Sequence, residues 1–99
     1  MSSGRIDFGE YLLELRTSAG YSQKKVADKL GIDISLLSKI EHGERQFQSY
    51  MLKPMSELFK LNYKEIQIQF LNQKIEADYG GEKYYNEVIM HIYKTKIEQ

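Results

Sequence analysis

Residues 21–43 read YSQKKVADKLGIDISLLSKIEHG, and this stretch decides the fold of the 99-residue chain. It contains two short segments with helical spacing of apolar residues, 23–30 and 34–41. Gly31 separates the segments and can adopt the positive φ that a tight turn requires. Ala27, in the middle of the first segment, is small enough for the two helices to cross closely. Together these features predict a helix-turn-helix unit.

Each of the two segments is only about two turns long, so neither would persist alone in water. Ser22 and Asp33 precede them as N-cap residues, whose side chains accept hydrogen bonds from backbone N–H groups of the first turn. The unit also has an apolar seam to place against a preceding helix: Val26, Leu30, Ile32, Leu37 and Ile40. Packing along this seam must therefore stabilise both helices.

Helical spacing continues on both sides of the unit. We expect a preceding helix over residues 8–18 and a later one over about 63–79. The alternation of apolar and polar residues within 66–70 is a strand signal, but the length of the segment favours a helix. After the breaker Gly80-Gly81, an amphipathic final helix is expected. The predicted fold class is all-α.

Composition limits the classes of function. Fourteen basic residues balance fourteen acidic ones, so nucleic-acid binding would have to come from local placement of charge. The chain has no cysteine, which excludes disulfides, thiolate metal sites and a cysteine nucleophile. Its longest uninterrupted apolar run is three residues, far short of a membrane span, and no signal-peptide pattern is present. We expect a cytoplasmic protein without a membrane partner.

The stretch from Tyr21 to Gly43 resembles the helix-turn-helix of the phage-repressor (Cro/cI-like, XRE) family, in particular its small stand-alone regulators. The resemblance lies in Ser-Gln opening the first helix, Ala and Gly in the turn unit, and the closing Ser-Lys-Ile-Glu-x-Gly. With the flanking helices it covers about residues 8–66. It implies a five-helix repressor-like DNA-binding domain, residues 5–66, followed by a helical tail, residues 67–99, with an additional C-terminal amphipathic helix.

The sequence departs from the family pattern after the helix-turn-helix. Many family members have a proline where this chain has Phe47, and its one proline comes later, at Pro54. A proline is tolerated only in the first turn of a helix, where its missing N–H has no partner. The fourth helix is therefore expected to start close to Tyr50 or to bend near Lys53.

Domains of this family place the second helix of the unit in the major groove of DNA, while the first crosses the phosphate backbone. The resemblance implies DNA contacts by nine residues: Ser22, Gln23, Lys24, Ile34, Ser35, Ser38, Lys39, His42 and Arg45. Gln23 is expected to contact phosphate, Lys39 to donate to guanine and Ile34 to touch a thymine methyl group. Two alternatives stay open: the lysines of the first helix form an ordinary solvated face, and His42 simply caps the second helix.

Local charge favours the same surface. Residues 16–53 contain seven basic and four acidic side chains, whereas residues 62–99 contain five basic and six acidic ones. Because this basic excess is small, we expect weak non-specific binding and a marked salt dependence of specific binding. Glu41 is expected to bond within the domain, to Arg16 or Arg45, rather than to touch DNA.

The tail is predicted to be a dimerisation element, because one short helix reads too few base pairs for useful discrimination. The expected two-fold interface consists of Phe70, Leu71, Ile75, Tyr85, Val88, Ile89, Ile92 and Tyr93. The alternative is that the last helix folds back on its own domain.

The predicted function is that of a transcriptional regulator that binds double-stranded DNA as a homodimer on a palindromic operator. The alternative is a protein-interaction module, an antitoxin or regulator antagonist, whose helical tail captures an unknown partner protein. An enzyme is not expected, because the sequence has no glycine-rich phosphate loop and no recognisable nucleophile–base pair. No cofactor and no metal site are expected.

Overall fold

The computed structural model describes residues 5–98; residue 99, the end of the predicted tail, lies outside this range. The described part of the chain is helical throughout and contains no strand, which confirms the all-α prediction. In chain order the elements are α1 (Phe8–Ala19), α2 (Gln23–Leu30), α3 (Ile34–Glu41), the 3₁₀ turn η1 (Ser49–Met51), α4 (Leu52–Phe59), α5 (Tyr63–Tyr79) and α6 (Tyr85–Ile97).

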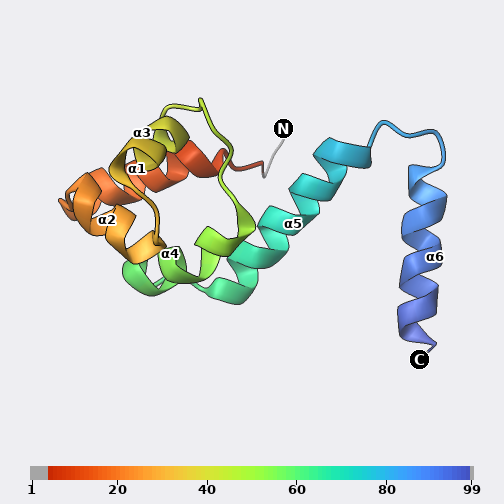
Figure 1. Ribbon diagram of the computed structural model, residues 1–99. Helices are drawn as coiled ribbons and strands as arrows, with labels where there is room; N and C mark the ends of the chain where they lie inside the picture. The colour runs from red at the N-terminus through yellow and green to blue at the C-terminus, as the bar shows by residue number, and fades with distance from the viewer. Residues whose placement is uncertain (1–4, 99) are drawn as a thin grey trace.

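Figure 1 shows α1 to α4 gathered into one compact group, with α5 leading away from it and α6 standing apart. The bounds of α2 and α3 agree with the prediction, and α1 ends one residue later than expected. The segment that showed a period-two alternation is part of α5, because the longer-range helical spacing of its apolar residues prevails. No helix within residues 5–98 has the length and apolar character needed to cross a membrane.

Local signals set the helix ends. The side chains of Asp7, Ser22 and Asp33 accept hydrogen bonds from backbone N–H groups in the first turns of α1, α2 and α3. Gly31, at φ 75°, ends α2 in the left-handed conformation that the tight turn requires. The turn of the helix-turn-helix is therefore built as the sequence predicts.

The core lies where α1, α2, α3 and α4 meet. Its most deeply buried large side chains are Leu12, Val26, Leu37, Ile40, Met51, Leu52 and Met55. The predicted seam is confirmed, since Val26, Leu30, Leu37 and Ile40 are buried and Ile32 packs against them partly exposed. Burial of this seam removes one side of α3 from solvent and leaves the other side free.

Gly9 makes the crossing of α1 and α3 possible. It is buried, and a Cβ atom at this position would collide with the backbone carbonyl oxygen of Ile40. Ala27 is also buried, as expected for the crossing of α2. The role of Ala27 was predictable from the sequence and that of Gly9 was not, because a glycine near a helix start does not by itself indicate close helix packing.

Pro54 is accommodated as predicted. The chain enters through η1, so that α4 begins at Leu52 and Pro54 is its third residue. At this position in the first turn, the missing N–H costs no intrahelical hydrogen bond.

Three phenylalanines fasten the loop before η1 and the first half of α5 to α1. Phe8, Phe47 and Phe70 are all buried, and their ring centroids lie 5.2–5.9 Å apart. The prediction that Phe70 belongs to a dimer interface is therefore wrong, because its ring is only 8% exposed and packs in the core of its own chain. Gln73 adds a hydrogen bond to each backbone polar group of Ile6.

These contacts bear on the predicted domain boundary. α5 runs without a break through residues 66 and 67, where the boundary was expected. The packed part of the chain continues along α5 as far as Gln73, through its hydrogen bonds to Ile6. The helix that separates from the compact part is α6.

Candidate nucleic-acid interface

The outer face of α3 is formed by Ile34, Ser35, Ser38 and Lys39, which we call the α3 face. Ile34 is 44% exposed, Ser35 and Lys39 are exposed, and Ser38 is half-buried. The side chain of Lys39 forms no hydrogen bond or ion pair with any residue in 5–98, so its ammonium group is available to a ligand. The structure therefore brings together the four residues that were expected to reach DNA bases.

An ion pair between α1 and the end of α3 helps to hold the α3 face in place. The Glu41 side chain is fully buried and accepts from Arg16 Nε at 2.7 Å and Nη2 at 3.1 Å. Arg16 Nη1 also donates to the backbone oxygen of Tyr21 at 3.1 Å. The network thus joins α1, the segment just before α2 and the end of α3. The expectation that Glu41 bonds within the domain is confirmed, with Arg16 as its partner.

Gln23 belongs to the same network. Its Nε2 donates to Glu41 Oε1 at 3.2 Å, a bond that sequence analysis did not foresee. The side chain of Gln23 therefore has a structural role within the domain. Spacing gives no signal for this bond, because Gln23 and Glu41 lie on different helices.

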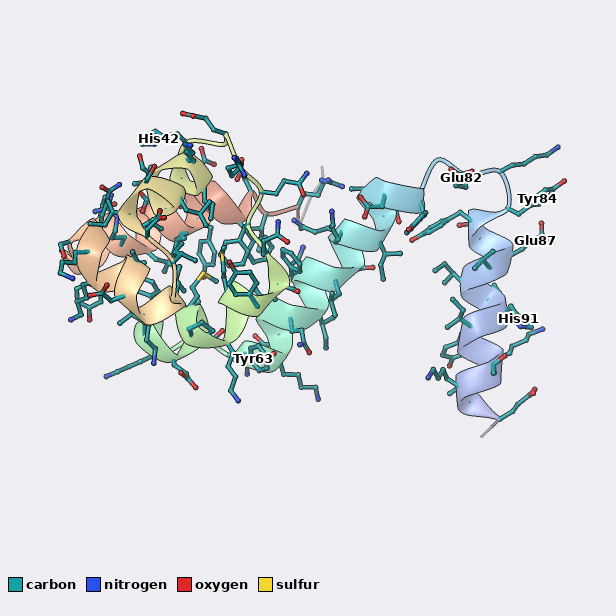
Figure 2. The ribbon with its side chains drawn as sticks, in the orientation of Figure 1. His42, Tyr63, Glu82, Tyr84, Glu87 and His91 are labelled. Carbon is teal, nitrogen blue, oxygen red and sulfur yellow. The ribbon has the colours of Figure 1, made fainter. Side chains whose placement is uncertain are left out.

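His42 caps the C-terminus of α3. Its Nδ1 lies 2.7 Å from the backbone oxygen of Ser38 and 3.5 Å from the Ser38 hydroxyl. The shorter distance fits an Nδ1–H that donates to the carbonyl. His42 is exposed at the outer end of the helix (Figure 2). The capping interpretation is confirmed, and the ring remains accessible from solvent.

The lysines of α2 each have a partner within the chain. Lys24 pairs with Asp28 at 3.0 Å, Lys29 pairs with Glu57 at 3.0 Å, and the Lys25 ammonium lies 3.8 Å from the centroid of the Tyr21 ring. Both ion pairs are solvent-exposed, and such pairs contribute little stability. A phosphate group could therefore replace Asp28 as the partner of Lys24 at small cost.

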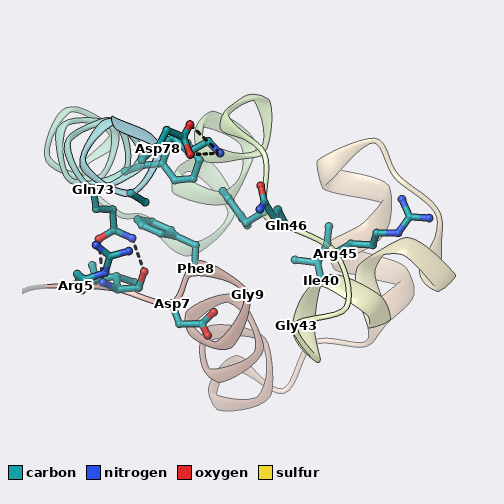
Figure 3. Close-up of a pocket in the computed structure, with 15 residues that line it drawn as sticks. Arg5, Asp7, Phe8, Gly9, Ile40, Gly43, Arg45, Gln46, Gln73 and Asp78 are labelled. Atoms are coloured by element: carbon teal, nitrogen blue, oxygen red, sulfur yellow. Dashed lines mark hydrogen bonds and ion pairs between the residues drawn. The ribbon is translucent and has the colours of Figure 1, made fainter. Parts of the chain in front are cut away.

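Arg45 is held close to the end of α3 by the backbone. The N–H groups of Glu44 and Arg45 both donate to the carbonyl oxygen of Lys39, at 2.8 and 3.3 Å. Buried Phe47 then fixes the loop two residues later. Arg45 is exposed and, in Figure 3, its guanidinium points away from the neighbouring cavity. Loop and helix thus place Arg45 and Lys39 in one region.

The cavity in Figure 3 has a volume of about 310 Å³ and lies between the start of α1, the loop after α3 and α5. Of the residues predicted to contact DNA, only Arg45 lines it. Lys74 beside it is paired with Asp78 at 3.4 Å. The cavity is therefore separate from the α3 face. Residues 5–98 contain no cluster of three metal-binding side chains.

Most of the predicted dimer residues are exposed. Leu71, Ile75, Val88, Ile89, Ile92 and Tyr93 are all between 40% and 62% exposed. Tyr85 is half-buried, and its hydroxyl donates to Glu76 Oε1 at 3.3 Å. Partial burial and this carboxylate raise the pKa of the Tyr85 hydroxyl above its ordinary value. Ile68 and Tyr79 also extend the exposed surface of α5. They were not among the predicted residues, although their helical spacing to Leu71 and Ile75 indicates the same side of the helix.

A family model described as a helix-turn-helix domain matches residues 9–67, more than half of the chain. No curated protein and no solved structure matches the chain. The matched residues include α1 except its first residue, α2 to α4 and the first turn of α5.

Proposed function

The chain belongs to the helix-turn-helix domain family, and we propose that it is a transcriptional regulator that binds a palindromic operator in double-stranded DNA as a homodimer. One observation carries the proposal: α3 buries Leu37 and Ile40 while its opposite side exposes an uncovered polar face. An α-helix with such a free side fits the major groove of B-form DNA.

The chemistry of the α3 face suits the reading of bases. Lys39 can donate to O6 or N7 of guanine, and the hydroxyl groups of Ser35 and Ser38 can donate to or accept from several bases. Ile34 offers an apolar contact for a thymine methyl group. We assign sequence specificity to these four residues.

Phosphate contacts come from the edges of this face. The N-terminus of α2, capped by Ser22, presents backbone N–H groups and a partial positive charge to a phosphate. Lys24 on one side and Arg45 on the other supply full charges. His42, at the end of α3, adds a ring that can donate to phosphate when it is protonated.

The homodimer is part of the proposal because the single recognition helix of one copy reads too few base pairs for useful discrimination. Two copies related by a two-fold axis would place two recognition helices one helical turn of DNA apart, about 34 Å. The exposed apolar residues of α5 and α6 support this part of the proposal, because contiguous apolar residues on a protein surface mark a contact with a partner.

Selection from random duplex DNA, followed by fluorescence anisotropy on the selected sites, tests the proposal. A palindromic consensus bound by two copies is expected. The Lys64→Ala variant serves as a control, because Lys64 lies at the start of α5, outside the α3 face. Recovery of no enriched sequence would reject the proposal.

A second candidate function is supported by α6, none of whose residues is buried. Such a helix could capture a partner protein, as an antitoxin or a regulator antagonist does. In that case, removal of α6 would abolish partner capture while operator binding by the α3 face remained unchanged.

A further inference from the structure

The outer side of α5 carries an apolar stripe that its own chain leaves uncovered. Ile68, Leu71, Ile75 and Tyr79 follow one another at spacings of three and four residues, which places them on one side of the helix. All four are between 42% and 59% exposed. Phe70 is buried on the other side. We call these four residues the α5 stripe.

α6 carries a second, shorter stripe. Tyr85, Val88, Ile89 and Ile92 recur at helical spacing, and the last three are between 40% and 52% exposed. We call them the α6 stripe. Each stripe extends over two to three turns, so that one could cover the other along its length.

α6 lacks the contacts that would stabilise it within one copy. It has 13 residues and none of them is buried, and an isolated helix of this length is marginal in water. Its hydrogen bond to α5 runs from the Tyr85 hydroxyl to Glu76, at the N-terminus of α6. Beyond this point Figure 2 shows α6, with His91 and Glu87 labelled, standing clear of the domain. The helix therefore requires a partner surface.

Charge favours α5 over a second α6 as that surface. α5 contains two lysines and three carboxylates, whereas α6 contains Lys94, Lys96 and a single carboxylate, Glu87. The two helices thus have net charges of opposite sign, while two α6 helices would have the same sign. Pairing of α6 with α5 is favoured.

We propose that the occupant is a second copy of this chain, and that α6 of each copy packs its stripe on the α5 stripe of the other. This exchange rests on the homodimer of the proposed function and specifies how it is built. It creates two equal seams and a four-helix bundle of the kind that buries such stripes.

The shape of the surface agrees with this arrangement. Each copy contributes both of its stripes, four side chains from α5 and four from α6. The bend between the two helices forms a half-open cavity of about 320 Å³ lined by Tyr79, Glu82, Lys83, Tyr84, Tyr85 and Val88. This mostly apolar space can receive a side chain of the partner's α6.

Two variants of the full chain test the exchange. Ile75→Asp places a charge in the α5 stripe and Ile89→Asp places one in the α6 stripe, at residues that are 42% and 40% exposed. Each variant alone should raise the dimer dissociation constant at least tenfold in sedimentation equilibrium. Met90→Asp is the matched control, because Met90 is 55% exposed and lies outside the stripe. Thermal melting by circular dichroism checks that all three variants are folded.

Mixing the two variants gives the decisive result. A mixed dimer has one intact seam, the α5 stripe of the Ile89→Asp chain against the α6 stripe of the Ile75→Asp chain, so equimolar mixing should restore dimers. A monomeric wild-type chain, an unchanged Ile75→Asp dimer or no restoration on mixing would each overturn the exchange. If the wild-type dimer forms as described but selects no DNA sequence, the proposed function fails and the exchange stands.

Discussion

Arg16 and Glu41 form a bidentate ion pair in which the Glu41 side chain is fully buried and the Arg16 side chain is 16% exposed. Both carboxylate oxygens have donors, since Gln23 bonds to one of them in addition to Arg16. A buried charge is tolerated only when it is paired in this way. Arg16 thus adds to the apolar seam a polar contact that holds the end of α3 against α1.

Replacing Arg16 with alanine should lower the free energy of unfolding by about 3–5 kcal/mol, because it leaves the buried Glu41 carboxylate without its main partner. Urea denaturation followed by circular dichroism measures the change. Lys24→Ala is the matched control, since it breaks an exposed ion pair and should cost less than about 1 kcal/mol. Equal effects of the two substitutions would contradict the role assigned to Arg16.

Gly9→Ala should destabilise the protein by about 1–3 kcal/mol, because the added methyl group collides with the backbone of α3 at Ile40. Gly81→Ala is the corresponding control, since nothing lies within 4 Å of a Cβ placed there. The midpoint of thermal unfolding of both variants compares them directly. A Gly9→Ala protein as stable as the wild type would show that α1 and α3 can separate without penalty.

The helices could be predicted from the sequence because their signals are local. N-cap residues, the glycine at 31 and apolar spacing each act within a few residues, and the bounds of α2, α3 and α5 agree with them. What escaped prediction depends on contacts between distant segments. Phe70 belongs to a helical apolar pattern, but only the meeting of α1, the loop and α5 shows that it is buried.

Ser56→Ala should leave the stability unchanged or raise it by up to about 1 kcal/mol. Ser56 lies buried in α4, and its hydroxyl has no hydrogen-bond partner among residues 5–98. Alanine removes this unpaired polar group and has the higher helix propensity. Urea denaturation provides the measurement, and a loss of more than 1 kcal/mol would mean that the hydroxyl has a partner in solution.

The candidate site, like the helices, could be predicted in outline because its signals are local in the sequence. Helical spacing alone places Leu37 and Ile40 on one side of α3 and Lys39 on the other, as the structure has them. The second role of Gln23, as a partner of Glu41, needed the fold. Because of this role, a loss of DNA affinity in Gln23→Ala could not be attributed to a phosphate contact alone. The substitution also weakens the Arg16–Glu41 network.

Lys39→Ala should weaken binding to the selected operator by about 1–3 kcal/mol and relax the preference at one base position in each half-site. The reason is that the Lys39 ammonium is exposed on the α3 face and is free to donate to a base. It has no partner among residues 5–98, so the substitution breaks no contact within the protein. Fluorescence anisotropy on the operator and on its single-base variants measures both effects. The stability of the protein should not change, since the side chain packs against nothing in the core.

Lys24→Ala is the control that separates a contact with a base from a contact with phosphate. Lys24 is assigned to phosphate, so its loss should weaken binding to all sequences by a similar factor and reduce the dependence of affinity on salt concentration. The selected consensus should therefore stay the same for Lys24→Ala and change at one position for Lys39→Ala. If both variants select the wild-type consensus, Lys39 contacts the backbone rather than a base, and specificity has to reside in Ile34, Ser35 and Ser38.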